Sequence, residues 1–305
     1  MIRVSIPCKV HLLGEWAVVW GKPALLTAVN LRMTATITPA KVSSDSEIKR
    51  IFEPIIKKEL KLKKIPPYTL TITSEIPMGC HLGSSAAVSV VCIAALLSHL
   101  RVKWDLDLIN KLAYEAEKVF HGNPSGADNS TVTFGGLMWY RKETTDLKII
   151  QPLPFSIPDK LAKNFVLINT GTPKVNTKQM ITDITALFEK NPQLKDQFLT
   201  GQERLTRELL PAIKDANEKE VIRIINEGEK NLERIGVCSP EVKKIIRAIE
   251  QAGGAAKICG AGASDGPTGV LLCYHQNKKI IEDIAKSYNL SYFKVDLGVE
   301  GLRRE

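Results

Sequence analysis

Hydrophobic and polar residues alternate along much of the first forty positions, which is the pattern of half-buried β-strands. Residues 2–13 and 24–39 follow it on either side of a Trp-Gly-Lys-Pro turn, and a third, shorter run follows it at 69–74. The start of the chain is therefore predicted to be rich in strands.

Beyond the first strands, the hydrophobic pattern changes to one typical of helices. Residues 86–100 are an unbroken run of small and apolar residues, which indicates a helix that is buried on all sides. Residues 105–122 repeat apolar side chains at helical spacing and end at a glycine, so an amphipathic helix is expected there. A capped helix interrupted by Pro54 is expected at 43–64, and residues 123–140 predict a turn-rich loop that leads into a strand.

Three prolines, at 152, 154 and 158, predict the boundary between a first domain at 1–160 and a second domain at 161–305. Beyond this boundary the pattern predicts, in order, a strand at 164–171, helices across 174–252 broken at Pro192, Pro211 and Pro240, two strands around a glycine-rich loop at 255–274, a helix at 277–288 and a strand at 292–302. Helices that cover a mostly antiparallel sheet give an α+β fold.

Composition narrows the class of protein. The chain has 305 residues, a hydrophobic fraction of 44% and a formal net charge of +9. Basic residues are scattered among acidic ones, which favours solvated helix faces over a nucleic-acid-binding patch; a basic cleft for an anionic substrate is the alternative. The six cysteines form no CxxC pair, and we find neither a signal-peptide core nor a bilayer-length apolar run. We therefore expect a cytoplasmic protein with reduced thiols and no membrane partner.

The stretch Pro-Met-Gly-Cys-His-Leu-Gly-Ser-Ser at 77–85 joins the strand at 69–74 to the most hydrophobic helix. A helix N-terminus carries unpaired N–H groups and partial positive charge, and glycines let a ligand approach the backbone closely. The stretch therefore predicts a phosphate-binding loop, although a plain glycine turn before a helix is the alternative. It is not a Walker A loop, because no lysine precedes Ser84 or Ser85.

Three other segments carry residues suited to phosphate chemistry. Lys9 and Glu15 flank the end of the first strand, Glu117 lies near the end of the amphipathic helix with Asp128 after it, and a second glycine-rich loop follows residue 257. Each residue has an ordinary alternative: an exposed edge charge for Lys9, a surface position for Glu117 and a local turn for Asp128. Glu115 is an alternative to Glu117.

These segments, in this order, resemble the GHMP kinase superfamily, and within it the mevalonate kinases most closely. The specific pieces are Gly-Glu-Trp-Ala-Val-Val-Trp-Gly-Lys-Pro-Ala-Leu, Leu-Gly-Ser-Ser-Ala-Ala and His-Gly-Asn-Pro-Ser-Gly-Ala-Asp-Asn, and the likeness covers nearly the whole chain. The resemblance implies an N-terminal ATP-binding α+β domain, a C-terminal ferredoxin-like α+β domain and an active site between them.

The resemblance also implies the roles of individual residues in an ATP- and Mg²⁺-dependent phosphotransfer. Asp128 matches the catalytic base, and Lys9 matches the lysine that keeps it ionised and stabilises developing charge. Ser85 and Glu117 match the magnesium ligands. His121 is interpreted as a helix-end residue favoured by the dipole. The loop residues implied to bind the ATP phosphates are Pro77, Gly79, Cys80, His81, Leu82, Gly83, Ser84, Ser85 and Ala86.

The implied acceptor is mevalonate, phosphorylated on its terminal hydroxyl, or a related hydroxy acid. The candidate substrate residues are Glu15, Trp16, Thr170, Gly171, Thr177, Gly260 and Ala261. The alternatives are a phosphomevalonate kinase or another small-molecule kinase of the superfamily and, from another class, a catalytically inactive ligand sensor. A homodimer is left open, and the adenine pocket is unassigned.

The sequence departs from the usual motifs in several places. Trp16 stands where the mevalonate kinases usually have a substrate-holding histidine, so the acceptor pocket is expected to be reshaped. Smaller residues are usual at Cys80 and His81, and Cys8 replaces a common glycine. The third loop carries Ser264, Asp265 and Pro267 among its glycines, which should stiffen it. Oxidation of Cys8, Cys80 and Cys259 is a hypothesis for regulation; buried, space-filling thiols are the alternative.

Overall fold

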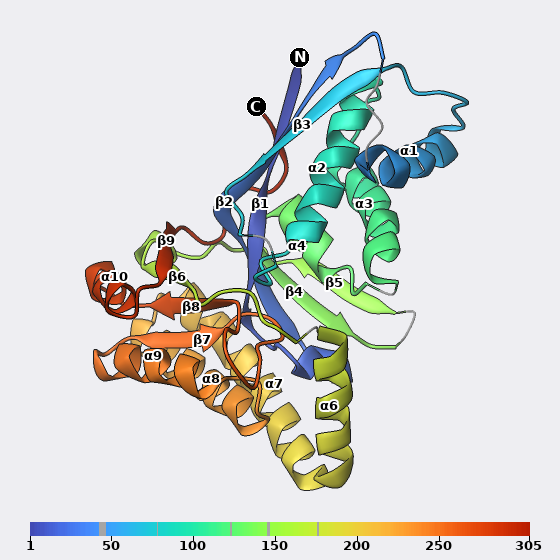
Figure 1. Ribbon diagram of the computed structural model, residues 1–305. Helices are drawn as coiled ribbons and strands as arrows, with labels where there is room; N and C mark the ends of the chain where they lie inside the picture. Colours follow the sequence, from blue (N-terminus) through green and yellow to red (C-terminus); the bar gives the residue numbers. More distant parts are fainter. Residues whose placement is uncertain (43–46, 78, 123, 145–146, 176) are drawn as a thin grey trace.

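The computed structural model describes residues 1–305 except 43–46, 78, 123, 145–146 and 176. The chain forms two sheets, each covered by its own helices (Figure 1). All strand pairs of the described residues are antiparallel, and helices are separated from strands along much of the chain. The α+β prediction is therefore confirmed.

The first sheet is built on two long neighbouring strands, β1 (Ile2–Leu13) and β2 (Ala24–Pro39). Its order is β10-β1-β2-β4-β5, and β3 also pairs with β2. The remaining strands are β3 (Tyr68–Ser74), β4 (Leu137–Lys142), β5 (Lys148–Pro152) and β10 (Arg303–Arg304). The predicted strands at 2–13, 24–39 and 69–74 are thus confirmed, and the register between β1 and β2 shifts at Pro7/Cys8, directly before Lys9.

Four helices pack beside this sheet: α1 (Glu47–Leu60), α2 (Ser84–His99), α3 (Leu106–His121) and α4 (Ala127–Phe134). Helix α2 is buried along almost its whole length, as its composition predicted. Helix α3 ends at Gly122, whose φ of 70° needs a residue without a Cβ atom.

Proline positions were predicted less well than helices. Helix α1 continues through Pro54, although an interruption was expected, and its expected cap lies outside the described residues. Pro54 points to solvent, while Phe52 and Ile56 bury their side chains, so core packing outweighs the lost backbone bond. Helix α7 likewise continues through Pro211, whose neighbours Ala212 and Ile213 are buried.

The loop expected after residue 123 is partly wrong, because residues 127–134 form helix α4. Most of its residues have weak intrinsic helix preference, which is why the sequence favoured a loop. Tertiary contacts decide otherwise: Asn129, Ser130, Thr131 and Val132 are buried, and the Thr131 hydroxyl donates to the carbonyl of Ala127 at 2.8 Å.

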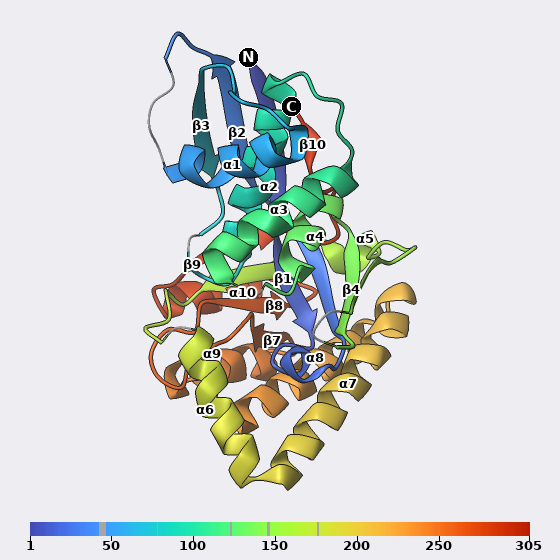
Figure 2. The same ribbon diagram turned by 90° about the vertical axis from the view of Figure 1, so that its right-hand side faces the viewer.

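The second sheet has the order β7-β8-β6-β9 and is covered by a layer of helices (Figure 2). Its strands are β6 (Phe165–Asn169), β7 (Ala255–Ile258), β8 (Val270–Tyr274) and β9 (Ser291–Val295). The helices of this half are α6 (Thr177–Lys190), α7 (Pro192–Lys214), α8 (Glu218–Arg234), α9 (Pro240–Gln251) and α10 (Lys278–Ser287). Pro192 and Pro240 each open a helix, as expected.

Two short elements complete the chain. A 3₁₀ turn, η1 (Ala17–Trp20), follows β1, and α5 (Asp159–Ala162) precedes β6. The last strand is shorter than expected: β9 ends at Val295, and the following residues return to the first sheet, where Gly298 N–H donates to the carbonyl of Ala28 at 2.9 Å. The division at residue 160 stays a prediction. No described helix is both long and apolar enough to span a bilayer.

Candidate active site

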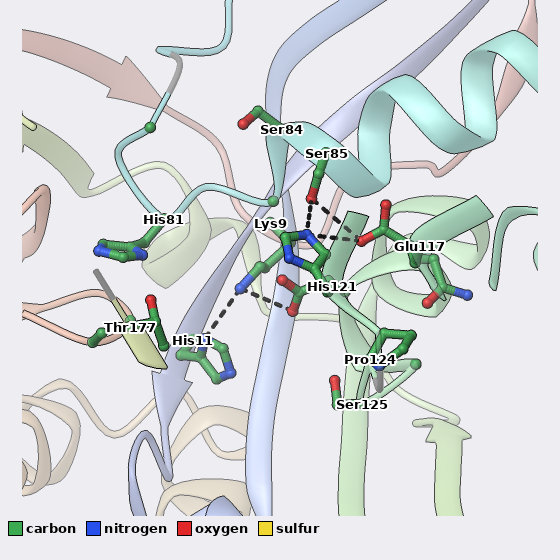
Figure 3. A pocket seen from close by; sticks show the side chains of 17 residues that line it. Lys9, His11, His81, Ser84, Ser85, Glu117, His121, Pro124, Ser125 and Thr177 are labelled. Carbon is green, nitrogen blue, oxygen red and sulfur yellow. Dashed lines mark hydrogen bonds and ion pairs between the residues drawn. The ribbon is translucent and has the colours of Figure 1, made fainter. Parts of the chain in front are cut away.

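A cavity of about 490 Å³ opens where the loop at 79–85, the ends of α3 and β1, the start of α4 and the second glycine-rich loop meet (Figure 3). Its lining comes from both halves of the chain. The lining residues are Lys9, His11, Gly79, His81, Gly83, Ser84, Ser85, Glu117, His121, Pro124, Ser125, Gly126, Asp128, Asn129, Thr177, Gly260 and Ala261.

Lys9 and Asp128 form an ion pair at the centre of this cavity. The Lys9 Nζ lies 3.0 Å from Asp128 Oδ1. Strand β1 buries the lysine, whereas Asp128, in the first turn of α4, keeps 38% of its side chain exposed. The backbone N–H of Lys9 also donates to the carbonyl of Leu82 at 3.1 Å, which fixes the strand against the loop at 79–85. The pair can therefore meet a reactant and carries both an acceptor for a proton and a positive charge.

His11 joins this pair and was not singled out from the sequence. It lies two residues after Lys9 on the same strand, so both side chains leave the same face. Its Nδ1 is 3.3 Å from the Lys9 Nζ. Burial and the charges of Lys9 and Lys257 hold the pKa of His11 well below its usual value. The imidazole is therefore neutral near pH 7. His11 could have been predicted from the alternation of side chains along a strand, which puts residues 9 and 11 on the same face.

A second polar cluster joins α2 to α3 on the other side of the cavity. Glu117 accepts hydrogen bonds from the hydroxyls of Ser85 at 3.2 Å and Ser89 at 2.7 Å. The His121 Nε2 lies 3.0 Å from Ser85 Oγ and 3.7 Å from Glu117 Oε2. Burial raises the pKa of Glu117, and the Ser89 hydroxyl and His121 partly offset this rise. His121 ends α3 as expected and also faces the cavity, because it lies one helical turn after Glu117.

The donors of this cluster suit a hard divalent cation. A serine hydroxyl and a carboxylate are oxygen ligands, and their place at the cavity wall leaves room for the waters that Mg²⁺ retains. The alternative ligand, Glu115, instead pairs with Lys118 at 2.6 Å on the exposed side of α3. Ser85 and Glu117 remain the predicted ligands.

The loop at 79–85, predicted to bind phosphate, has a backbone that allows a ligand to approach closely. Gly83 has a φ of 73°, and a Cβ atom there would lie 3.0 Å from the Cγ of Lys9. Helix α2 begins at Ser84 without a side-chain cap. The hydroxyls of Ser84 and Ser85 are thus not used to close the helix end. Met78 lies outside the described residues.

The predicted site residues divide into those that line the cavity and those that support it. Cys80 directs its thiol to the Asn169 side-chain oxygen at 3.6 Å, while Leu82 and Ala86 are in the core. Thr170 holds the second glycine-rich loop, since its hydroxyl donates to the carbonyl of Gly269 at 2.7 Å. The predicted residues outside the cavity lining are Glu15, Trp16, Pro77, Cys80, Leu82, Ala86, Thr170 and Gly171. Their assigned roles stay predictions.

Trp16 and Glu15 line a smaller apolar cavity of about 160 Å³ that shares four residues with the larger one. The Trp16 indole N–H donates to the carbonyl of Ala261 at 3.1 Å, so this donor is not available to a substrate. Glu15 forms a fully buried ion pair with Lys257, which comes from β7. Burial raises the pKa of Glu15, and the charge of Lys257 opposes this rise.

All six cysteines are buried and unpaired by disulfides. Burial raises the pKa of Cys8 and of Cys80, and it raises the pKa of Cys259 to about 11. A high pKa leaves little thiolate, the form that reacts with oxidants. These observations favour space-filling thiols, and redox regulation stays an untested hypothesis.

Comparisons with known proteins agree on one family. The family model described as "GHMP kinases N terminal domain" matches residues 46–136, and "GHMP kinases C terminal" matches residues 209–290. A mevalonate kinase of Archaeoglobus fulgidus is 31% identical over 268 residues, covering 85% of this chain and 88% of the relative.

Solved structures share the fold at lower identity. The mevalonate kinase of Methanococcus jannaschii superposes with a TM-score of 0.81 at 21% identity, covering 97% of this chain and 98% of that one. A Streptococcus pneumoniae phosphomevalonate kinase in complex with phosphomevalonate and AMPPNP gives a TM-score of 0.77 at 19% identity, covering 97% of this chain and 100% of that one.

Proposed function

The chain belongs to the GHMP kinase family and is an ATP-dependent small-molecule kinase, and on that premise we propose that its acceptor is mevalonate. The reaction would transfer the γ-phosphoryl group of ATP to the terminal hydroxyl, giving 5-phosphomevalonate and ADP. The observation that carries this proposal is the Lys9–Asp128 pair, open to a cavity that Ser85 and Glu117 also line.

Asp128 and Lys9 would act on the acceptor. The hydroxyl oxygen forms a bond to the γ-phosphorus as the bond to the leaving ADP oxygen breaks, and Asp128 accepts the hydroxyl proton. Lys9, 3.0 Å from Asp128, keeps that carboxylate oriented and stabilises negative charge on the transferred group. His11, neutral because its pKa is lowered, adds no further charge at this point.

The phosphate-binding loop and the start of α2 would hold the nucleotide. The N-terminus of α2 lies at the cavity, because Gly83, Ser84 and Ser85 line it, and the unpaired backbone N–H groups of a helix N-terminus favour anionic oxygens. Ser85 and Glu117 would hold Mg²⁺, which supplies charge neutralisation for the phosphates.

The charge of the cavity supports mevalonate over phosphomevalonate. Among the described lining residues, Lys9 is the single lysine or arginine, and Asp128 already pairs with it. A phosphorylated acceptor would bring roughly two further negative charges, which call for additional basic side chains at its binding site.

The decisive experiment measures ADP release from MgATP with mevalonate and with phosphomevalonate, beside an Asp128→Asn variant. We expect turnover with mevalonate and a loss of about 10²- to 10⁴-fold in kcat for the variant, because a general base of this kind contributes that much. Turnover with phosphomevalonate alone would overturn the acceptor assignment. An unimpaired Asp128→Asn variant would overturn the role of Asp128.

A further inference from the structure

His81 is an unusual residue at the centre of the phosphate-binding loop. Its side chain lines the main cavity (Figure 3), and its Nε2 is buried without a hydrogen-bond partner among the described residues. Its φ of 64° lies in the left-handed region, which a residue with a Cβ atom seldom adopts. Strained backbone and an unsatisfied polar atom that occur together at a cavity wall indicate a functional position.

The second glycine-rich loop holds the His81 ring in place. A Cβ atom at Gly260 would lie 2.6 Å from the Cβ of His81, and one at Gly269 would lie 3.1 Å from its Cδ2. Both glycines also have positive φ values. The ring is therefore clamped between a loop of the first half and a loop of the second half, and it has little freedom to turn towards solvent.

The other donors at this end of the cavity are already engaged. Lys9 pairs with Asp128, and Lys257 is fully buried and pairs with Glu15. The Trp16 indole N–H donates to Ala261, as described above. A negatively charged group of an acceptor would thus find no uncommitted lysine or arginine among the described lining residues.

We propose that His81 recognises the carboxylate of a hydroxy-acid acceptor by donating its Nδ1–H to it, since Nε2 is buried out of reach of a ligand, and so determines which acceptor the enzyme takes. This inference rests on the proposed function, since it assigns a residue to the acid end of the same substrate. The placement agrees with this: His81 and Thr177 lie on one side of Lys9, and Ser85, Glu117 and His121 lie on the other (Figure 3). The hydroxyl would meet Lys9 and Asp128 while the acid end reaches His81.

The charge state of His81 suits a donor. Burial and the charge of Lys9 lower its pKa, and Asp128 partly offsets this. The ring is neutral at pH 7 and carries one N–H. A hydrogen bond from such a group to a carboxylate is charge-assisted, so it is stronger than the same bond to an uncharged amide.

The test compares two acceptors in two proteins: mevalonate and its primary amide, which has the same shape without the charge, with the wild type and a His81→Gly variant. We expect the wild type to prefer the acid by about tenfold or more in kcat/KM, the difference that one charge-assisted bond provides. In His81→Gly the KM for mevalonate should rise by a similar factor, while the amide changes much less. The acid-to-amide ratio should approach one.

Two controls separate the imidazole from the backbone. Lys61→Gly also removes a side chain from a positive-φ residue, at 53°, far from the cavity, and should leave both acceptors unchanged. His81→Asn tolerates the left-handed backbone and keeps an N–H donor, so it should retain part of the preference and provides a folded variant if His81→Gly is unstable.

An unchanged acid-to-amide ratio in His81→Gly would overturn the inference. A loss of MgATP affinity equal to the loss for mevalonate, measured by calorimetry, would also overturn it, because His81 would then serve the nucleotide. If the wild type turns over neither acceptor, the proposed function fails by itself. Calorimetry with mevalonate then decides the inference: weaker binding to His81→Gly supports it, and equal or absent binding to both proteins overturns it.

Discussion

Two lysine–carboxylate pairs each have one member near the end of β1, Lys9 in the first pair and Glu15 in the second, and the two pairs differ in almost every physical respect. Lys9 and Asp128 are 3.0 Å apart, and their side chains are 4% and 38% exposed. Lys257 and Glu15 are 0% and 2% exposed, and Lys257 also donates to the carbonyls of His11 and Ile258. The first pair opens on the larger cavity, whereas the second is almost fully buried, with Glu15 at the wall of the smaller cavity.

This difference in side-chain burial distinguishes a pair that can react with a substrate from a pair that stabilises the fold. A carboxylate that keeps contact with the cavity can accept a proton from a substrate, so Asp128 is available for chemistry. A fully buried pair instead joins two parts of the fold, since neither charge tolerates the loss of its partner. Lys257 extends from β7 of the second sheet to Glu15, next to the end of β1, and thereby connects the two halves behind the active site.

The same substitution at the two lysines gives the largest contrast. Lys9→Met should lower kcat by about 10³-fold, because it removes the charge that orients Asp128 and stabilises the transferred group. The free energy of unfolding should change little, since Asp128 can still be solvated from the cavity. Steady-state kinetics and urea denaturation measure the two effects. A large loss of stability with intact kcat would show that the first pair is structural.

Lys257→Met should act in the opposite way. It leaves the Glu15 carboxylate buried without a partner, which costs about 3–5 kcal/mol of unfolding free energy. The folded fraction should keep most of its kcat, because Lys257 does not line the cavity. Urea denaturation of the variant tests this. An unfolding free energy within about 1 kcal/mol of the wild type, a typical surface-pair effect, would mean that the pair is not truly desolvated.

Removing the carboxylate of the buried pair together with its lysine sharpens the comparison. In Glu15→Gln combined with Lys257→Met no buried charge remains, so we expect more than half of the lost stability to return. The four proteins of this double-mutant cycle give the coupling energy directly. Additive losses in the cycle would contradict a direct interaction between the two side chains.

The smallest effect concerns His11, which touches both pairs through its ring and its carbonyl. Its pKa is well below the usual value in the folded state, so only the unfolded state gains this proton as the pH falls through about 6.5. Stability should therefore be fully present above that pH and decline below it, by on the order of 1 kcal/mol between pH 7 and 5.5. The decline should be shallower in His11→Gln. Parallel stability curves for the two proteins would exclude His11 as its source.

The comparison of the two pairs could not have been made from the sequence. Lys9, Glu15 and Asp128 are all motif residues, whereas Lys257 appears in the sequence only as the start of a glycine-rich loop. Its partner is 242 residues away along the chain. A periodic pattern describes which face of an element is buried and carries no information about a contact over that separation.

Several local features were decided in the same way by distant contacts. Residues 127–134 have a composition typical of loops and yet form α4, because the surrounding core buries them. Pro54 and Pro211 stay inside helices whose neighbouring side chains are packed. Trp16 was expected to reshape the acceptor pocket. The structure shows where its indole N–H goes, to the carbonyl of Ala261.

The sequence by itself determined the elements with strong periodicity and the α+β class, because these depend on the spacing of apolar residues within one segment. It also determined the family, because the motif residues are ordered along the chain. Tertiary structure alone decided that His11 and His121 join Lys9, Asp128, Ser85 and Glu117 at one cavity, and that Lys257 pairs with Glu15. The reason is physical: the charge and reactivity of a side chain depend on its solvation and neighbours, and folding brings these together from remote segments.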